Sequence, residues 1–174
     1  DGTFINYRHH SLNPNSVSSD RISCVLKDRS GIVWVGTRDA GLNKFSRYKV
    51  TFEHYKNIPG SDKSFSNENV LALCEDQKGD LWIGTLGGGL NRYDKSTQSF
   101  FYYKHNPTDP NSLSHNVVNS ILEDRSGELW VGTRGGGLSR YDRIKDSFEH
   151  YKNEIYNNSS ISNDNVSSIF EDKR

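Results

Sequence analysis

The segment EDRSGELWVGTRGGGLSRYD, residues Glu123–Asp142, recurs along this chain of 174 residues. An earlier copy, EDQKGDLWIGTLGGGLNRYD at Glu75–Asp94, is identical at fourteen of the twenty positions, and a looser copy, KDRSGIVWVGTRDAGLNKFS, occupies Lys27–Ser46. Successive copies are offset by 48 residues, as their tryptophans show: Trp34, Trp82 and Trp130. A strict period of roughly 40 to 50 residues is typical of repeat architectures, in which each repeat is one supersecondary unit.

Each period divides into four short predicted strands, which in the third copy are residues 117–123, 128–133, 137–141 and 147–152. The first is apolar on both faces, which predicts a strand buried between neighbouring layers. Asp124 and Gly127 bracket a hairpin turn, because Asp caps nearby backbone N–H groups and Gly tolerates a positive φ. No segment has the apolar spacing of a helix. Four strands and tight turns per period are typical of one β-propeller blade.

The predicted fold class is therefore all-β, a β-propeller fragment covering residues 1–174 with three complete four-stranded blades, at 21–56, 69–104 and 116–152. Residues 1–10 align with the outer strand of a preceding blade, and residues 165–172 align with the inner strand of a following blade. Since three blades fall short of the usual 4–8 of a closed ring, we expect the chain to be a piece of a longer polypeptide, whose remaining blades are its partners.

Polar connections rich in Asn, Ser, Asp and Pro join the predicted blades, and they lie on the same face as the turn between the second and third strands. Loops on a rigid frame often carry function. Their amide and imidazole groups both donate and accept hydrogen bonds, which suits hydroxyl-rich ligands, although turn capping by Asn is an alternative role. The candidate ligand-binding residues at the mouth of the channel are Asn67, Asn69, His115, Asn116, Asn163, Asn165, Arg38 and Arg134.

The three tryptophans Trp34, Trp82 and Trp130 lie in the middle of predicted second strands. Large aromatic side chains dominate core burial, so we expect these residues to pack one blade on the next, and sugar stacking is the alternative. Cys24 and Cys74 fall in different columns of the repeat and are interpreted as small buried core residues rather than a disulfide.

The residues that could support catalysis are distributed as structural features. The Glu-Asp pairs at 75–76, 123–124 and 171–172 recur once per repeat at the hairpin, whereas a glycosidase needs two carboxylates at a single site. No motif for a nucleophile elbow, a phosphate loop or a zinc site occurs, so we predict no catalytic residues, no metal, no cofactor and no enzymatic activity. With 22 basic and 22 acidic residues, the balanced charge argues against binding of nucleic acid.

At these residues the chain resembles the two-component regulator propeller repeat, through the motifs ED, LWxGT and GGLxRYD at fixed spacing in Asn69–Asp94 and Asn116–Asp142. The resemblance implies the extracytoplasmic sensor region of a hybrid histidine kinase, a periplasmic location and recognition of polysaccharide breakdown products. The copy at Arg21–Ser46 departs from the pattern, with Lys27 in place of Glu and Asp39 with Ala40 in place of two glycines.

Two functions are compatible with the sequence. In the first, the propeller segment senses a polysaccharide-derived ligand at the face that carries the inter-blade loops, as part of a two-component receptor. In the second, the ring is a structural or protein-interaction platform that binds no small ligand, including a surface for a homodimer of the full-length receptor.

Overall fold

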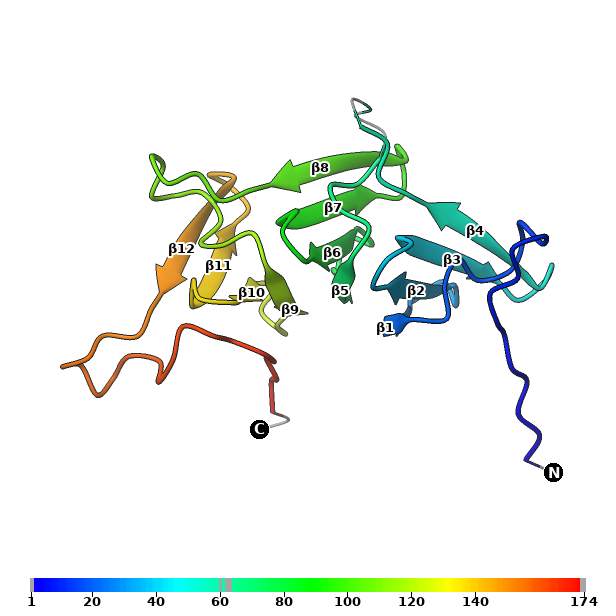
Figure 1. Ribbon diagram of the computed structural model, residues 1–174. Coiled ribbons are helices and arrows are strands. Elements are labelled where there is room, and N and C mark those ends of the chain that lie inside the picture. Colours follow the sequence, from blue (N-terminus) through cyan, green and yellow to red (C-terminus); the bar gives the residue numbers. More distant parts are fainter. Residues whose placement is uncertain (1, 60, 62–63, 173–174) are drawn as a thin grey trace.

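A computed structural model describes residues 2–59, 61 and 64–172. Its strands form three four-stranded antiparallel sheets, and no helix occurs among the described residues. Figure 1 shows the sheets fanned in an arc, with the first strand of each at the inner edge and the fourth at the outer edge. The predicted all-β class with three four-stranded blades is confirmed.

The strands follow one another in space in the order of the chain. Blade 1 consists of β1 (Ile22–Lys27), β2 (Val33–Thr37), β3 (Leu42–Ser46) and β4 (Thr51–Tyr55). Blade 2 consists of β5 (Val70–Glu75), β6 (Leu81–Thr85), β7 (Leu90–Asp94) and β8 (Ser99–Tyr103). Blade 3 consists of β9 (Val118–Glu123), β10 (Leu129–Thr133), β11 (Leu138–Asp142) and β12 (Ser147–Tyr151).

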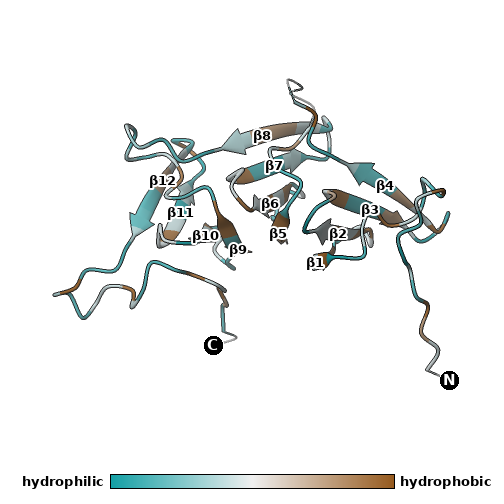
Figure 2. Ribbon diagram, viewed as in Figure 1, coloured by the Kyte–Doolittle hydropathy of each residue, from teal (hydrophilic) through white to brown (hydrophobic). Residues whose placement is uncertain are grey.

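The buried strands are the second strands, not the first. Every residue of β6 is buried, whereas β1 and β9 are largely half-buried or exposed, and Val25 of β1 is 62% exposed. The prediction that the first strands are buried on both faces is therefore wrong for β1 and β9. The physical reason is their position, since they border the open inner side of the arc. Composition is not the reason for β9, because this strand is brown, that is hydrophobic, in Figure 2.

An aromatic layer fills each interface between neighbouring blades. The ring of Trp34, 1% exposed, lies 5.8 Å from Tyr55 of its own blade and 5.9 Å from Tyr93 of blade 2. Trp82, which is fully buried, lies 5.3 Å from Tyr141 of blade 3. The tilted and edge-to-face arrangements are the geometries that aromatic rings prefer. The repeated tryptophan thus contacts the next blade at both internal interfaces.

The glycine of the LWxGT motif allows the inner strand of the next blade to approach the second strand. A Cβ atom at Gly84 would lie 2.6 Å from Val118 Cγ1 and 2.9 Å from the Val118 carbonyl oxygen. Equivalent clashes would occur between Gly36 and Val70 and between Gly132 and Val166. At this point the backbone of a second strand therefore touches a valine side chain of the following repeat, and no room is left for a methyl group.

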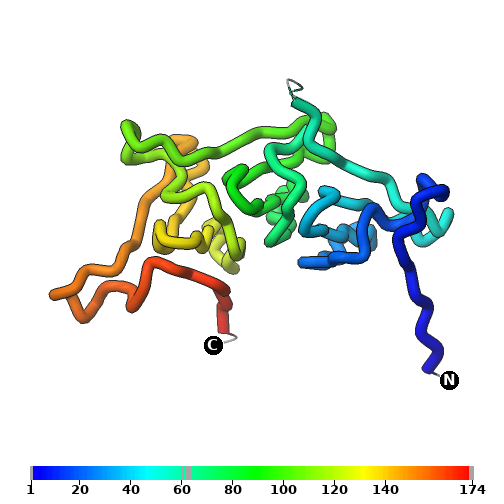
Figure 3. Tube along the Cα trace, viewed as in Figure 1, coloured from blue at the N-terminus to red at the C-terminus, as the bar shows by residue number. Residues whose placement is uncertain are grey.

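The N-terminal segment contacts blade 1 and the C-terminal segment contacts blade 3, and neither forms a strand ladder among the described residues. Tyr7 lies 5.0 Å from Phe45. Asn165 forms an isolated bridge with Arg134, and the C-terminal segment, red in Figure 3, returns toward the inner edge of blade 3. That these segments are strands of further blades stays a prediction.

Both cysteines are free and half-buried. Burial raises the pKa of the Cys24 thiol to about 11, so this thiol stays protonated near neutral pH. Their role is packing, because Cys24 and Cys74 border the hydrophobic clusters of the two blade interfaces.

Candidate functional site

The loop face, which carries the inter-blade connections and the turns 38–41, 86–89 and 134–137, is assembled from two neighbouring blades at every position. Gly89 N donates to the carbonyl of Asn116, and Gly137 N donates to that of Asp164, both at 2.9 Å. Gly137 has φ of 79° and a Cβ there would lie 2.3 Å from the Tyr151 carbonyl oxygen, so the turn requires glycine. Each turn is thereby fixed to the connection that precedes the next blade.

Each connection also closes on itself by the same bonds. In all four, a backbone N–H at the start of the loop donates to a serine hydroxyl six residues later, at 2.9 to 3.0 Å: Ser16, Ser64, Ser112 and Ser160. A His or Asn side chain one residue earlier bonds a carbonyl eight residues on: His9, Asn57, His105 and Asn153. Among the described residues these loops are thus held by internal hydrogen bonds, and these His and Asn side chains serve that purpose.

Three of the predicted site residues cap the start of the following inner strand. Asn67 Oδ1 accepts from the backbone N–H of residue 69 at 2.8 Å, His115 Nδ1 accepts from that of residue 117 at 3.1 Å, and Asn163 Oδ1 accepts from that of residue 165 at 2.7 Å. The capping role that the sequence left as an alternative is therefore present. Because the acceptor atom is used, the asparagine amides and the second ring nitrogen of His115 are left to donate.

The other asparagines of the candidate set are placed differently. Asn116 Oδ1 accepts from the backbone N–H of His105 at 2.8 Å, so it is part of the loop closure. Asn69 is half-buried and its Oδ1 is enclosed without a hydrogen-bond partner among the described residues. Asn165 is exposed. Only Asn69 and Asn165 thus keep their side-chain carbonyl oxygen free of a capping bond.

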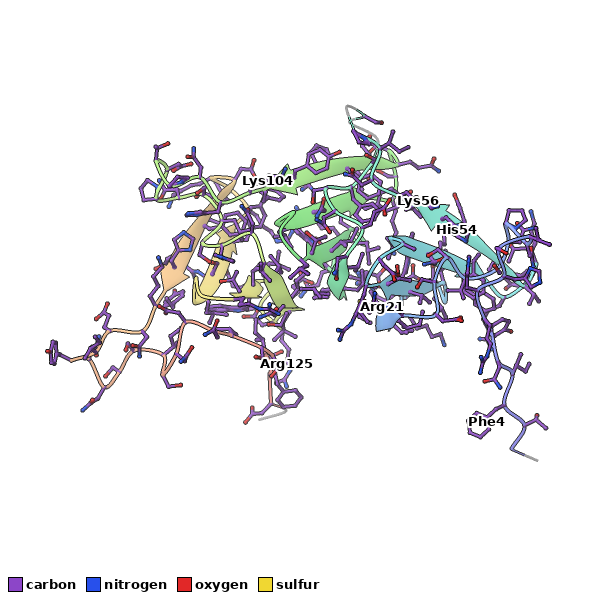
Figure 4. All side chains as sticks on the ribbon, viewed as in Figure 1. Phe4, Arg21, His54, Lys56, Lys104 and Arg125 are labelled. Carbon is purple, nitrogen blue, oxygen red and sulfur yellow. The ribbon has the colours of Figure 1, made fainter. Side chains whose placement is uncertain are left out.

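Arg38 and Arg134 lie at equivalent turn positions, both exposed, and neither forms an ion pair within the part of the chain that the structure describes. Blade 2 has Leu86 at this position. Arg21, which was not among the predicted site residues, lies directly before β1 (Figure 4) and pairs with Asp39 at 3.2 Å. That pair neutralises Asp39, which lies next to Arg38. The sequence signal for the pair was Asp39 itself, which stands where the other two copies have glycine.

The opposite face, which we call the hairpin face (turns 28–31, 76–79 and 124–127), carries the Glu-Asp pairs. Lys95 Nζ of blade 2 donates to Asp28 Oδ2 of blade 1 and to Glu75 Oε1, each at 2.8 Å. Asp28 also accepts from Trp34 Nε1 at 2.9 Å. The next interface repeats this bridge with Arg143, at 3.0 and 2.7 Å from its two carboxylates: Asp76 and Glu123. Because Asp28, Glu75, Asp76 and Glu123 are occupied by these bonds, the four carboxylates serve to hold neighbouring blades together.

Titration of this bridge gives the blades a defined pH dependence. Burial raises the pKa of Asp28, but hydrogen bonds from Lys95, Ser30 and Trp34 outweigh it and hold the pKa well below its usual range. Burial likewise opposes the bonds from Lys95 that lower the pKa of Glu75. An unfolded Asp has a pKa of about 3.9, so the unfolded state binds more protons at low pH. The stabilisation from Asp28 is therefore complete above about pH 5 and is lost as the pH falls further.

We expect the urea midpoint of unfolding to fall more steeply between pH 6 and pH 3 in the unmodified chain than in a Lys95→Met variant, which lacks the shared cation. Burial raises the pKa of Glu123 at the neighbouring interface, so its contribution has the opposite sign and is common to both proteins. Equal slopes for the two proteins would show that the bridge does not set the acid response.

The histidines of the outer strands are used in packing rather than ligation. His54 Nε2 bonds the carbonyl of Ser16 at 2.7 Å, and His150 Nδ1 bonds Ser139 Oγ at 3.0 Å. Burial lowers the pKa of His150. In the described part of the chain, no group of three or more His, Cys, Asp or Glu side chains is arranged to hold a metal ion. The same residues contain no helix long and apolar enough to cross a membrane.

The fold and the internally bonded loop face define a segment of a β-propeller. Residues 16–39, 64–87 and 112–135 match the model of the two component regulator propeller. The resemblance to the two component regulator propeller repeat is therefore confirmed at these residues. Each match covers the end of a connection and the first two strands of a blade. No curated protein matches the chain.

Solved structures support the same assignment. The chain is 25% identical to the extracellular domain of a one component system, BT4673 from B. thetaiotaomicron, with a TM-score of 0.75, over 94% of this chain and 21% of that one. It is 29% identical to the extracellular domain of a hybrid two component system, BT3049 from the same organism, with a TM-score of 0.72, over 84% and 20%. The chain thus spans about a fifth of these neighbours' length.

A virginiamycin B lyase from Staphylococcus aureus is 17% identical, with a TM-score of 0.59 over 83% of this chain and 44% of the lyase, which shows a shared fold alone. The matched family and the two extracellular domains come from signalling systems, which agrees with the prediction that this segment is not an enzyme.

Proposed function

We propose that this chain is part of the periplasmic sensor propeller of a hybrid two-component system, and that its loop face binds an oligosaccharide derived from a polysaccharide. The likeness to the extracellular domains of a one component system and of a hybrid two component system supports the sensor role. The remaining blades and the output domain lie outside this chain, so the signal passes through segments that the chain does not contain.

The inference about the ligand rests on the free hydrogen-bond donors of the loop face. Capping uses one acceptor lone pair on each of Asn67, His115 and Asn163 and leaves their N–H groups. Arg38 and Arg134 add two guanidinium groups that no described carboxylate neutralises. A donor-rich, cationic surface favours a ligand rich in acceptors and bearing negative charge. The ligand class is therefore an oligosaccharide that contains uronate carboxylates.

The experiment is titration calorimetry of the chain with oligogalacturonates of three to six units, compared with neutral oligosaccharides of the same length. We expect the acidic series alone to bind, and Arg38→Ala or Arg134→Ala to weaken binding about tenfold or more, since a charge-assisted hydrogen bond contributes about 1.5–3 kcal/mol. Lys78→Ala, on the exposed hairpin face, is the control and should bind as the unmodified chain does. Equal affinity for neutral sugars, or binding that survives both arginine substitutions, would contradict the proposal.

A further inference from the structure

A carboxylate at the end of each inner strand receives the hairpin of the preceding blade. Glu75 Oε2 accepts from Arg29 N at 2.8 Å and also from its Nε at 3.2 Å. Glu123 Oε2 accepts from Gln77 N at 2.6 Å. The C-terminal segment repeats the contact, because Arg125, beside it in Figure 4, donates its backbone N–H to Glu171 Oε2 at 3.1 Å. At this position a carboxylate therefore accepts the backbone N–H of a hairpin residue that is neutral or basic.

Blade 1 has a cation where the other repeats have this carboxylate. The equivalent position is Lys27, which is exposed and forms no ion pair within the described residues. Arg47 occupies the position of Lys95 and Arg143, the bridging cations, and it too has no ion pair in the described part of the chain. Two cations thus stand where the other interfaces have one cation and one carboxylate.

Both cations line a groove of about 810 Å³ on the open face of blade 1, which we define by Lys27, Ile32, Phe45, Arg47 and Tyr48. Burying two unpaired cations against a neighbour that carries Arg at its hairpin would be strongly unfavourable. A partner at this face must instead supply two carboxylates.

The shape of the partner follows from Tyr7. Its ring lies 5.0 Å from Phe45 and 5.7 Å from Phe52. At the internal interface, the outer-strand residue Tyr55 lies 5.6 Å from Tyr93 and 6.2 Å from Phe100, the residues equivalent to Phe45 and Phe52. Tyr7 therefore already holds the place of an outer strand of a preceding blade, and the rest of the open face is what the first three strands of such a blade would cover.

We propose that the open face of blade 1 docks a further blade of the same repeat, and that the hairpin of this blade carries an acidic residue at the position of Arg29, Gln77 and Arg125. The hairpin Asp of that blade pairs with Arg47, as Asp28 pairs with Lys95. The additional carboxylate pairs with Lys27. The reversed charge makes this interface incompatible with the other blades described here, so it specifies blade order by repulsion as well as attraction. The inference concerns the blade partner and is independent of any sugar ligand.

The test adds a blade to the whole chain. A duplicate of residues 116–146 is placed directly before Thr3, so that residues 3–9 become its outer strand. One version keeps Arg at the duplicated position 125, and the other carries Arg125→Glu in the duplicate. We expect the Glu version to have a melting temperature higher by about 2–4 °C, the shift that a single favourable ion pair produces in a chain of this size. When Lys27→Glu is introduced into both versions, the Arg version should have the higher melting temperature.

Two further measurements show whether the added blade docks and whether the effect of the substitution depends on the residue that it faces. Arg125→Glu at the original position faces Glu171, so there the same substitution should lower the melting temperature. Amide exchange should show protection of the duplicated strands in the Glu version. Equal melting temperatures of the two versions, an order that Lys27→Glu does not invert, or unprotected duplicated strands in both versions would each overturn the proposal, whatever the chain does with oligogalacturonates.

Discussion

Replacing Asp76 by alanine should lower the free energy of unfolding by about 3–5 kcal/mol, because it breaks a buried, charged hydrogen-bond network. The carboxylate is fully buried and accepts from Trp82 Nε1 at 2.9 Å and from the backbone N–H groups of Lys78 and Asp80 at 3.0 Å. It also pairs with Arg143 of blade 3 at 3.0 Å. The substitution would leave a partly buried guanidinium and several N–H groups without their acceptor.

The matched control is Asp124→Ala. Asp124 makes the same bonds within its hairpin, to Trp130 Nε1 at 2.7 Å and to the backbone N–H of Glu128 at 3.0 Å, but no cation of a following blade reaches it among the described residues. Its loss should therefore cost less. Urea unfolding followed by tryptophan fluorescence measures both. Equal losses would show that the bridge across the interface contributes nothing beyond the hairpin bonds.

The second large effect is expected for Trp82→Ala, at about 3–5 kcal/mol, which is the usual cost of truncating a buried aromatic side chain. Trp82 is fully buried between Tyr103, 5.7 Å away in its own blade, and Tyr141 of blade 3. A cavity at this point cannot collapse, because the close approach of Gly84 and Val118 fixes the distance between the blades.

Trp130→Ala provides the comparison within the same repeat. Trp130 is only half-buried and its ring contact in the described structure is Tyr151 of its own blade, at 5.7 Å. The expected loss is smaller than for Trp82, and the measurement is the chemical unfolding of both variants by far-UV circular dichroism. A loss at Trp130 as large as that at Trp82 would indicate that the tryptophan acts within its blade and not between blades.

The strands were predictable because their signals are local. The period, the short apolar runs and the Asp-x-x-Gly turns place each strand of blade 3 within one residue of its observed start, as for 128–133 against Leu129–Thr133. The error on the burial of the first strands has a non-local cause. An apolar run such as residues 117–123 does not reveal whether its second face meets a neighbouring layer or the open side of an arc.

The column of the repeat that the candidate residues occupy was predictable, but their hydrogen bonds were not. Repeat alignment placed Asn67, His115 and Asn163 in one column, and the structure shows that this column caps the next strand. Which atoms remain available depends on those bonds. The pairing of Arg21 with Asp39 likewise depends on the turn being folded beside the start of β1.

The sequence by itself determined that this protein repeats a four-stranded unit every 48 residues, because turn residues and short apolar runs act over a few neighbouring positions. Tertiary structure alone decided which polar groups are paired. The bond from Arg29 to Glu75 and the bridge from Lys95 to Asp28 join residues 46 and 67 positions apart. Such partners meet only when one blade packs on another, and the unpaired cations Lys27 and Arg47 are recognisable only by comparison with those bonds.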